Sequence, residues 1–241
     1  MDSLNSLSLE SNRQIKINFA GGDLSSDAGL LLIKEFTCKL GFLKLLKSLF
    51  KTNDTALLRQ HKDDENLWQV IYQILGAYFE DDCADELIHD PVLTAILDKK
   101  ALASQPTLSR FFNRMDETTL NQVYVLMRRF RKVVYAIKRP QLLLLDLDST
   151  LLATYGHQEG EGFNFHYQSH GYHPLVCYDG MTGDLLKIEL RNGTDYSSTG
   201  AREFLQPLLD EFLTDIHYSL TLLAGSKTRY LIIMRKLYSH E

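Results

Sequence analysis

Cysteine and long apolar runs are both scarce in this sequence, and their scarcity argues against two classes of protein. The 241 residues include only three cysteines, Cys38, Cys83 and Cys177, without metal-ligand spacing. An odd, sparse set fits a reducing cytoplasm better than a secreted disulfide scaffold. The polar stretch from Met1 to Lys16 lacks the apolar core of a signal peptide. No apolar run approaches the length of a membrane span, so we expect a cytoplasmic protein with no membrane partner.

The chain also lacks an excess of positive charge, but its charges are unevenly distributed. It carries 26 Lys and Arg against 31 Asp and Glu, a net charge of −5. Residues 52–98 hold eleven acidic and two basic residues, whereas residues 99–139 hold ten basic and two acidic residues. Such asymmetry indicates polyanion binding by the basic segment, although any single cation there fits a solvated helix face as well. The candidate DNA contacts are Arg110, Arg114, Arg128, Arg129, Arg131 and Lys132.

Helical periodicity dominates residues 1–140. Apolar residues recur every three or four positions between Thr118 and Lys138, which predicts an amphipathic helix with its arginines on the other side. Residues 66–79 are apolar around most of a helix, which predicts a core helix containing Trp68. Residues 14–19 alternate like a short strand. We expect residues 1–140 to form a helical, DNA-binding N-terminal region.

The pattern changes after Pro140. Strands are predicted at residues 142–145, 174–178 and 185–190, the last two joined by a Gly-containing hairpin turn. Residues 155–162 read as a polar loop, residues 200–213 as a helix, and residues 218–223 as a fourth strand. Three strands, a helix and a further strand make an α/β half-domain over residues 141–241. The fold class is therefore α+β or α/β, with helices first and a sheet second.

The stretch 142–150, Leu-Leu-Leu-Leu-Asp-Leu-Asp-Ser-Thr, carries the clearest chemistry. Asp146 and Asp148 are two residues apart, so a strand would point both side chains to the same face. Two carboxylates beside a buried strand are costly unless paired, and Mg²⁺ is commonly held by one or two carboxylates plus phosphates. A single Asp here would fit a turn or helix cap. The pair favours metal-assisted work on a phosphate ester, with Asp146 and Asp148 as catalytic and metal-binding candidates.

Four histidines lie within residues 157–173, which raises the question of a zinc site. They are His157, His166, His170 and His173, and their spacing fits no familiar zinc pattern. We expect Tyr172-His173-Pro174 to position the second strand or to contact the substrate backbone, and we assign no metal to these histidines.

Five motifs in order resemble the DDE transposases of bacterial insertion sequences, specifically insertion-sequence family 1380. The resemblance covers about residues 14–213. The motifs are Phe19-Ala-Gly-Gly-Asp-Leu-Ser-Ser-Asp-Ala-Gly29, Ser104-Gln-Pro-Thr-Leu-Ser-Arg110, Leu145-Asp-Leu-Asp-Ser-Thr150, Gly171-Tyr-His-Pro174 and the segment Arg191-Asn-Gly-Thr.

The resemblance implies an RNase H-like core in which two Asp and one Glu hold two metal ions, Mg²⁺ or Mn²⁺. It assigns the catalytic role to Asp148, with Asp146 either an auxiliary metal ligand or a residue that supports the ligand without contacting the metal. It implies DNA as the partner, both transposon ends and target, in a bacterial cytoplasm and at the nucleoid. It is also compatible with a homodimer.

The sequence departs from the family near its C-terminal end. The second Asp is expected after the fourth strand in a motif like Arg-x-Asp-Ser-Gly-Phe, but residues 222–228 read Leu-Leu-Ala-Gly-Ser-Lys-Thr. No region after it supplies the third acid, and Glu241 receives no role. We therefore expect a truncated or frameshifted copy that is catalytically incomplete.

Two alternatives remain open. Asp146-Leu-Asp148-Ser-Thr150 also fits the Asp-x-Asp-x-Thr signature of haloacid dehalogenase-like phosphohydrolases, with Asp146 as nucleophile and Asp148 as general acid. That family places the motif near the N-terminus and requires a later acidic pair, which is missing here. The other alternative is a non-catalytic DNA-binding protein that grips phosphates through the basic segment.

Overall fold

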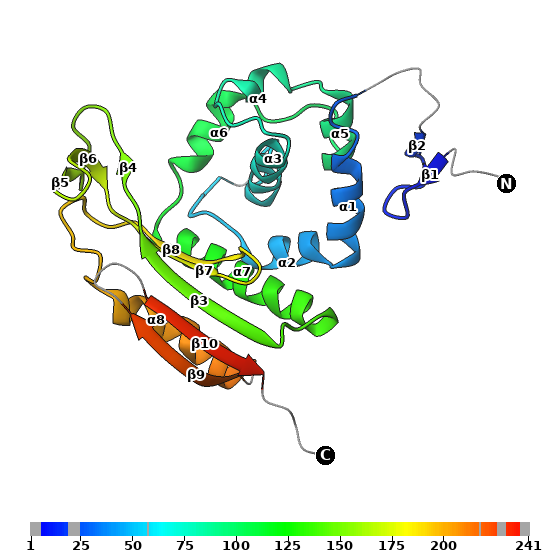
Figure 1. The fold of residues 1–241 in the computed structure, drawn as a ribbon. Coiled ribbons are helices and arrows are strands. Elements are labelled where there is room, and N and C mark those ends of the chain that lie inside the picture. Colours follow the sequence, from blue (N-terminus) through cyan, green and yellow to red (C-terminus); the bar gives the residue numbers. More distant parts are fainter. Residues whose placement is uncertain (1–5, 19–24, 57, 217, 226–229, 237–241) are drawn as a thin grey trace, which may run out of the picture. The chain divides into compact units, whose positions relative to one another are not determined.

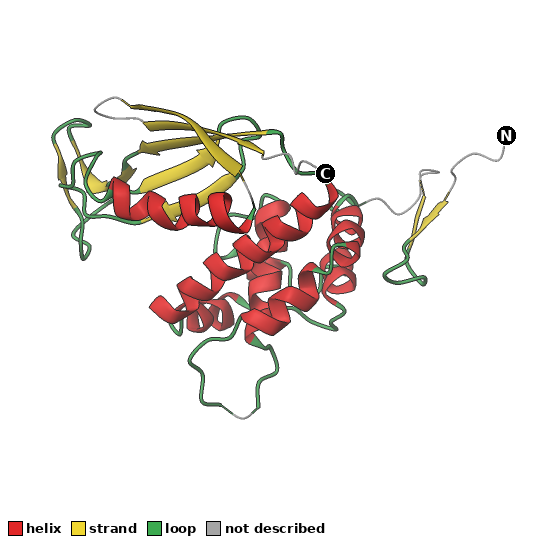
Figure 2. Cartoon of the chain, turned by 90° about the horizontal axis from the view of Figure 1, so that it is seen from below, coloured by secondary structure: helices red, strands yellow, loops and turns green. Residues whose placement is uncertain are grey.

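The computed structural model describes residues 6–18, 25–56, 58–216, 218–225 and 230–236. The chain divides into two compact units, residues 1–134 and 135–241, and the division falls within one long helix. Figure 1 labels the elements of both units, and Figure 2 shows helices concentrated in the first and strands in the second. Part of the first resemblance motif, residues 19–24, lies outside the described residues.

The first unit is helical. It contains β1 (Ser6–Ser8), β2 (Lys16–Asn18), α1 (Leu30–Lys39), α2 (Phe42–Leu49), α3 (Asp63–Leu75), α4 (Cys83–Glu86), α5 (Pro91–Leu97), α6 (Gln105–Phe112) and most of α7 (Glu117–Ile137). The strands β1 and β2 form an antiparallel hairpin. The long amphipathic helix and the short strand predicted from the sequence are thus confirmed as α7 and β2.

Local side chains explain where two of these helices begin. Asp90 Oδ1 accepts hydrogen bonds from the amides of Val92 and Leu93 at 2.9 and 2.7 Å, ahead of α5. Asp116 Oδ1 accepts from the Thr119 amide at 2.9 Å at the start of α7. Such bonds satisfy amides that have no partner within the first helical turn.

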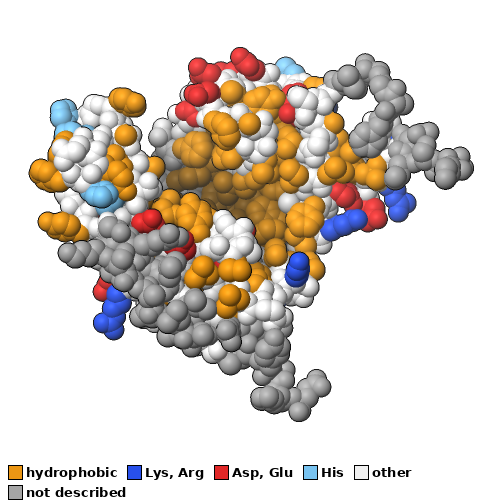
Figure 3. Space-filling view, viewed as in Figure 1, with side chains coloured by type: hydrophobic (Ala, Val, Ile, Leu, Met, Phe, Trp, Pro, Cys, Tyr) orange, Lys and Arg blue, Asp and Glu red, His pale blue; other side chains and the backbone are white. Residues whose placement is uncertain are grey.

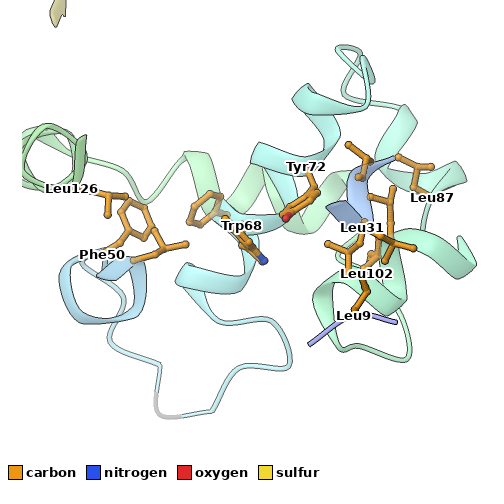
Figure 4. Close-up of a cluster of buried hydrophobic side chains, with 13 residues drawn as sticks. Leu9, Leu31, Phe50, Trp68, Tyr72, Leu87, Leu102 and Leu126 are labelled. Atoms are coloured by element: carbon orange, nitrogen blue, oxygen red, sulfur yellow. The ribbon is translucent and has the colours of Figure 1, made fainter. Parts of the chain in front are cut away.

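Helix α3 lies at the centre of the first core. Trp68 is 4 % exposed and Tyr72 is fully buried, and their rings meet edge to face with centroids 4.7 Å apart. This confirms the predicted core role of Trp68. Figure 4 shows the surrounding cluster, which includes Leu9, Leu31, Phe50, Leu87, Leu102 and Leu126.

The second unit is built on a five-stranded sheet. Its order is β8 (Leu185–Glu189), β7 (Leu175–Asp179), β3 (Leu142–Ser149), β10 (Tyr230–Lys236) and β9 (Tyr218–Gly225). Every neighbouring pair is antiparallel. Helix α8 (Ala201–Asp210) and the π-helical turn η1 (Glu211–Asp215) lie along one face of the sheet (Figures 1 and 2). Lys187 Nζ on β8 donates to the Phe204 carbonyl of α8 at 2.9 Å.

Two features of this unit differ from the sequence prediction. The fourth predicted strand is β9, but the unpredicted β10 lies between it and β3, so β9 runs parallel to β3 without touching it. A small second sheet, β4 (Leu152–Ala153), β6 (Ser169–Tyr172) and β5 (Gly162–Asn164), occupies the connection between β3 and β7. Gly171 is required there, because a Cβ atom would lie 2.3 Å from the Leu152 carbonyl oxygen.

Candidate active site

Strand β3 presents the two predicted carboxylates on one face, as their spacing required. Leu143, Leu145 and Leu147 are buried, whereas Asp146 is half-buried and Asp148 is exposed. Because side chains alternate along a strand, both acids lie on the face opposite Leu143, Leu145 and Leu147. The apolar leucine run therefore anchors the strand in the core and leaves the carboxylates accessible.

The end of β3 is fixed by contacts from the neighbouring segment. Asp148 Oδ1 accepts a hydrogen bond from the Ser149 amide at 2.8 Å. The Ser149 carbonyl accepts from the Tyr167 hydroxyl at 3.3 Å, and the Thr150 amide donates to the Pro174 carbonyl at 3.4 Å. The β5–β6 turn, through Tyr167, and Pro174, just before β7, thus hold the backbone that directly follows Asp148.

The strands beside β3 offer no further carboxylate in the Asp146 row. Asp146 is opposite Tyr178 of β7 and Leu231 of β10, and Leu231 is opposite Ala224 of β9. Within the described residues, no group of three or more His, Cys, Asp or Glu side chains is arranged to hold a metal ion. Asp146 and Asp148 are therefore the carboxylates that β3 provides on this face.

Asp179, at the end of β7, has a different role that the sequence analysis did not assign. It is fully buried and lies opposite Leu145, on the leucine face of the sheet. Its Oδ1 accepts from the amides of Leu144 and Met181 at 3.3 and 3.0 Å, and its Oδ2 accepts from the Thr182 hydroxyl at 3.1 Å. Asp179 therefore organises the β7–β8 turn. The only hint in the sequence was the turn cluster of residues 179–184.

Two resemblance motifs meet next to the candidate strand. The His173 amide donates to the Arg191 carbonyl at 3.2 Å, and Arg191 Nε donates back to the His173 carbonyl at 3.0 Å. Arg191 Nη1 also donates to the carbonyls of Tyr196 and Thr199. Burial lowers the pKa of the Arg191 guanidinium below its usual value. The Arg191 motif therefore joins β7 to the loop before α8, a role that its spacing in the sequence did not reveal.

Three of the four histidines in residues 157–173 make separate contacts. His157 and His170 both approach Glu161, at 3.4 and 3.0 Å from their Nδ1 atoms. The hydrogen bond from His170 is the main cause that lowers the pKa of Glu161. His173 Nδ1 instead lies 2.8 Å from the Asp195 carbonyl. This contact joins His173, just before β7, to the loop that precedes α8.

The predicted basic residues occupy two places in the helical unit. On α7, Arg128, Arg129 and Lys132 are exposed and Arg131 is half-buried, and we refer to these four residues as the basic side of α7. Arg110 is exposed on α6, whereas Arg114 Nη2 is 3.1 Å from Asp63 Oδ1. The acidic half of the charge asymmetry is visible as Asp and Glu side chains gathered over α4 (Figure 3).

The comparison with protein families identifies the class. A family model described as transposase DDE domain group 1 matches residues 7–225. The chain therefore belongs to the DDE transposase family, and the match lends no support to the phosphohydrolase alternative. No curated protein and no solved structure shows a significant match. No helix among the described residues is long and apolar enough to cross a membrane.

Proposed function

We propose that this chain is a transposase of insertion-sequence family 1380. It contains a DNA-binding region and a catalytic core that is incomplete. The observation that carries the proposal is the pair Asp146 and Asp148, presented on the accessible face of β3 inside the family-matched segment. The family's reaction is cleavage and joining of DNA strands. An RNase H-like core is supported by the antiparallel series β3, β7 and β8 followed by α8, whereas β9, parallel to β3, is separated from it by the antiparallel β10.

Divalent metals are usual in the DDE family, and the donors on β3 suit them. Carboxylate oxygens are the ligands that Mg²⁺ and Mn²⁺ prefer, and Asp148 and Asp146 would hold one such ion. In a complete two-metal site, one bound ion would activate the attacking water or 3′-hydroxyl and the other would stabilise the leaving oxygen. In this proposal Asp148 is the catalytic ligand, and Asp146 assists it from the same face.

Residues 1–241 supply only one side of that site in this proposal. The row beside Asp146 holds Leu231 and Ala224, and the only acidic residue after Asp215 is Glu241. Two-metal chemistry needs carboxylates on both sides of the scissile phosphate. DNA binding is assigned to the basic side of α7 and to Arg110, so the 241 residues retain the means to hold DNA.

The test uses a protein in which the coding frame downstream of codon 241 is restored to one that encodes an Asp-Ser-Gly-Phe-like segment and a later Glu. We expect metal-dependent cleavage of DNA carrying the element's ends, abolished by Asp148→Ala. The matched control is Asp184→Ala, which removes an exposed carboxylate from the β7–β8 turn. If cleavage survives Asp148→Ala, the catalytic assignment fails; if no frame encodes the missing acids, the truncation proposal fails.

A further inference from the structure

A small polar cavity in the helical unit is lined by an unusual number of hydrogen-bond donors. Its volume is about 160 Å³, and its walls come from α3, α6 and the segment before α3. The lining includes three arginines, a histidine, an amide and a hydroxyl: Arg59, His61, Asn66, Thr107, Arg110 and Arg114. Arginine forks and hydroxyls are groups that proteins use to hold phosphate oxygens.

Asn66 lines this cavity with an amide that has no partner. The residue is 1 % exposed, and neither Nδ2 nor Oδ1 makes a hydrogen bond within the described part of the chain. Buried polar side chains almost always have a partner, and an unmatched one indicates a bound water, ion or ligand. The Asn66 amide therefore points to a bound water, ion or ligand in this cavity, to which Nδ2 can donate a hydrogen bond.

The balance of charges around the cavity is positive. Arg59 pairs with Asp54, and Arg114 lies 3.1 Å from Asp63 and 3.6 Å from Asp54. Arg110 forms no ion pair with the described residues; its Nη2 reaches only the Thr107 hydroxyl, at 3.5 Å. Three guanidinium groups thus face two carboxylates, and Arg110 supplies the unbalanced charge.

His61 adds a neutral donor. Its Nδ1 lies 3.0 Å from Lys99 Nζ, and an ammonium can only donate, so the ring proton resides on Nε2. Burial, followed by the charge of Lys99, lowers the pKa of His61. Lys99 Nζ lies 2.5 Å from Glu65 Oε2, so the negative charge of Glu65 is balanced by Lys99.

We propose that this cavity is a phosphate-binding site, with Arg110 as the principal cation and Asn66 as a buried donor. Resting on the proposed function, we identify the ligand as a backbone phosphate of DNA; a free phosphate ion would be bound by the same groups. The site extends the DNA-binding surface to α6 and the start of α3, and it explains why the Ser104–Arg110 motif contains both Thr107 and Arg110.

The test compares the full chain with Arg110→Gln and Asn66→Asp. Binding to a short duplex is measured by fluorescence anisotropy over a salt series, and binding of inorganic phosphate by calorimetry at constant ionic strength. We expect both variants to bind DNA about tenfold more weakly, and Arg110→Gln to lower the salt slope by about 0.9. Arg202→Gln, which removes an exposed arginine from α8, should bind as wild type does.

The two probes separate the possible failures. If only inorganic phosphate binds, and neither variant binds it, the cavity is a phosphate site while the proposed DNA function fails. If wild type binds DNA and both variants match it in affinity and salt slope, the cavity is not part of the DNA surface and the inference is overturned. Wild-type protein that binds neither probe overturns it as well. Because Arg110 is exposed, its variant remains informative even if Asn66→Asp impairs folding.

Discussion

Asp148 and Asp179 lie on opposite faces of the same antiparallel pair of strands. Asp148 is opposite Val176 and exposed, whereas Asp179 is opposite Leu145 and fully buried. Residues directly opposed in an antiparallel pair share a face, so Asp179 points to the leucine side and Asp148 to the other. The Asp148 carboxylate is accessible to a ligand, whereas both oxygens of the Asp179 carboxylate accept hydrogen bonds, most of them from the β7–β8 turn.

This difference predicts unequal effects on stability. Asp179→Ala should lower the free energy of unfolding by about 2–4 kcal/mol, because it leaves two amides and a hydroxyl without their acceptor. Asp148→Ala should change it by less than about 1 kcal/mol, since the side chain is exposed. Urea denaturation followed by circular dichroism measures both. Equal losses of stability in the two variants would show that Asp148 is also a structural residue.

The basic side of α7 should dominate DNA affinity. Replacing Arg128, Arg129, Arg131 and Lys132 by Ala should weaken binding and reduce the salt slope by up to about 0.9 for each DNA phosphate that the variant no longer neutralises. Fluorescence anisotropy over a salt series provides the measurement. The control replaces Lys44 and Lys47, exposed on α2, and should leave the slope unchanged. An unchanged slope in the α7 variant would place the DNA surface elsewhere.

The local sequence pattern was sufficient to predict the helices and strands whose apolar residues recur at a regular spacing. The leucine run predicted a buried strand, the Asp146–Asp148 spacing placed both acids on one face, and the spacing of apolar residues predicted α7. Caps such as Asp90 are local as well, so α5 was predictable from Pro91 and its neighbours.

Long-range pairing was not predictable in the same way. Whether β9 or β10 adjoins β3 depends on hydrogen bonds between strands far apart in the chain, which no local period encodes. The small sheet was missed because its strands are only two to four residues long and lie among glycines. The partners of Arg191 and the burial of Asn66 likewise exist only after the fold has formed.

Tyr72 should make the protein sensitive to alkali. Burial raises the pKa of its phenol to about 12, above the ordinary value near 10. Its contribution to stability is therefore complete below pH ~10 and declines as the pH rises through about 12, since the unfolded chain releases the proton first. Tyr72→Phe should reduce the decline in stability between these pH values. Tyr155→Phe, at a side chain 93 % exposed, should have no effect, and equal curves for both variants would contradict the assignment.

Metal binding at β3 should be weak. Two carboxylates leave most of the coordination of Mg²⁺ to water, so affinity is limited. We expect Mn²⁺ to broaden the NMR signals of residues 145–150 only at high concentration, and less so in Asp148→Ala. Tight, stoichiometric binding there would show that further ligands are already in place.

The most direct test of the central claim is a strand-cleavage assay of the 241-residue chain itself. The claim is that these residues present Asp148 and Asp146 from one side of a DDE site without the opposing acids. With DNA carrying the element's ends and either Mg²⁺ or Mn²⁺, we expect neither nicking nor joining above the level without protein. Metal-dependent cleavage by the 241-residue chain, abolished by Asp148→Ala, would contradict the claim and show that the site is complete.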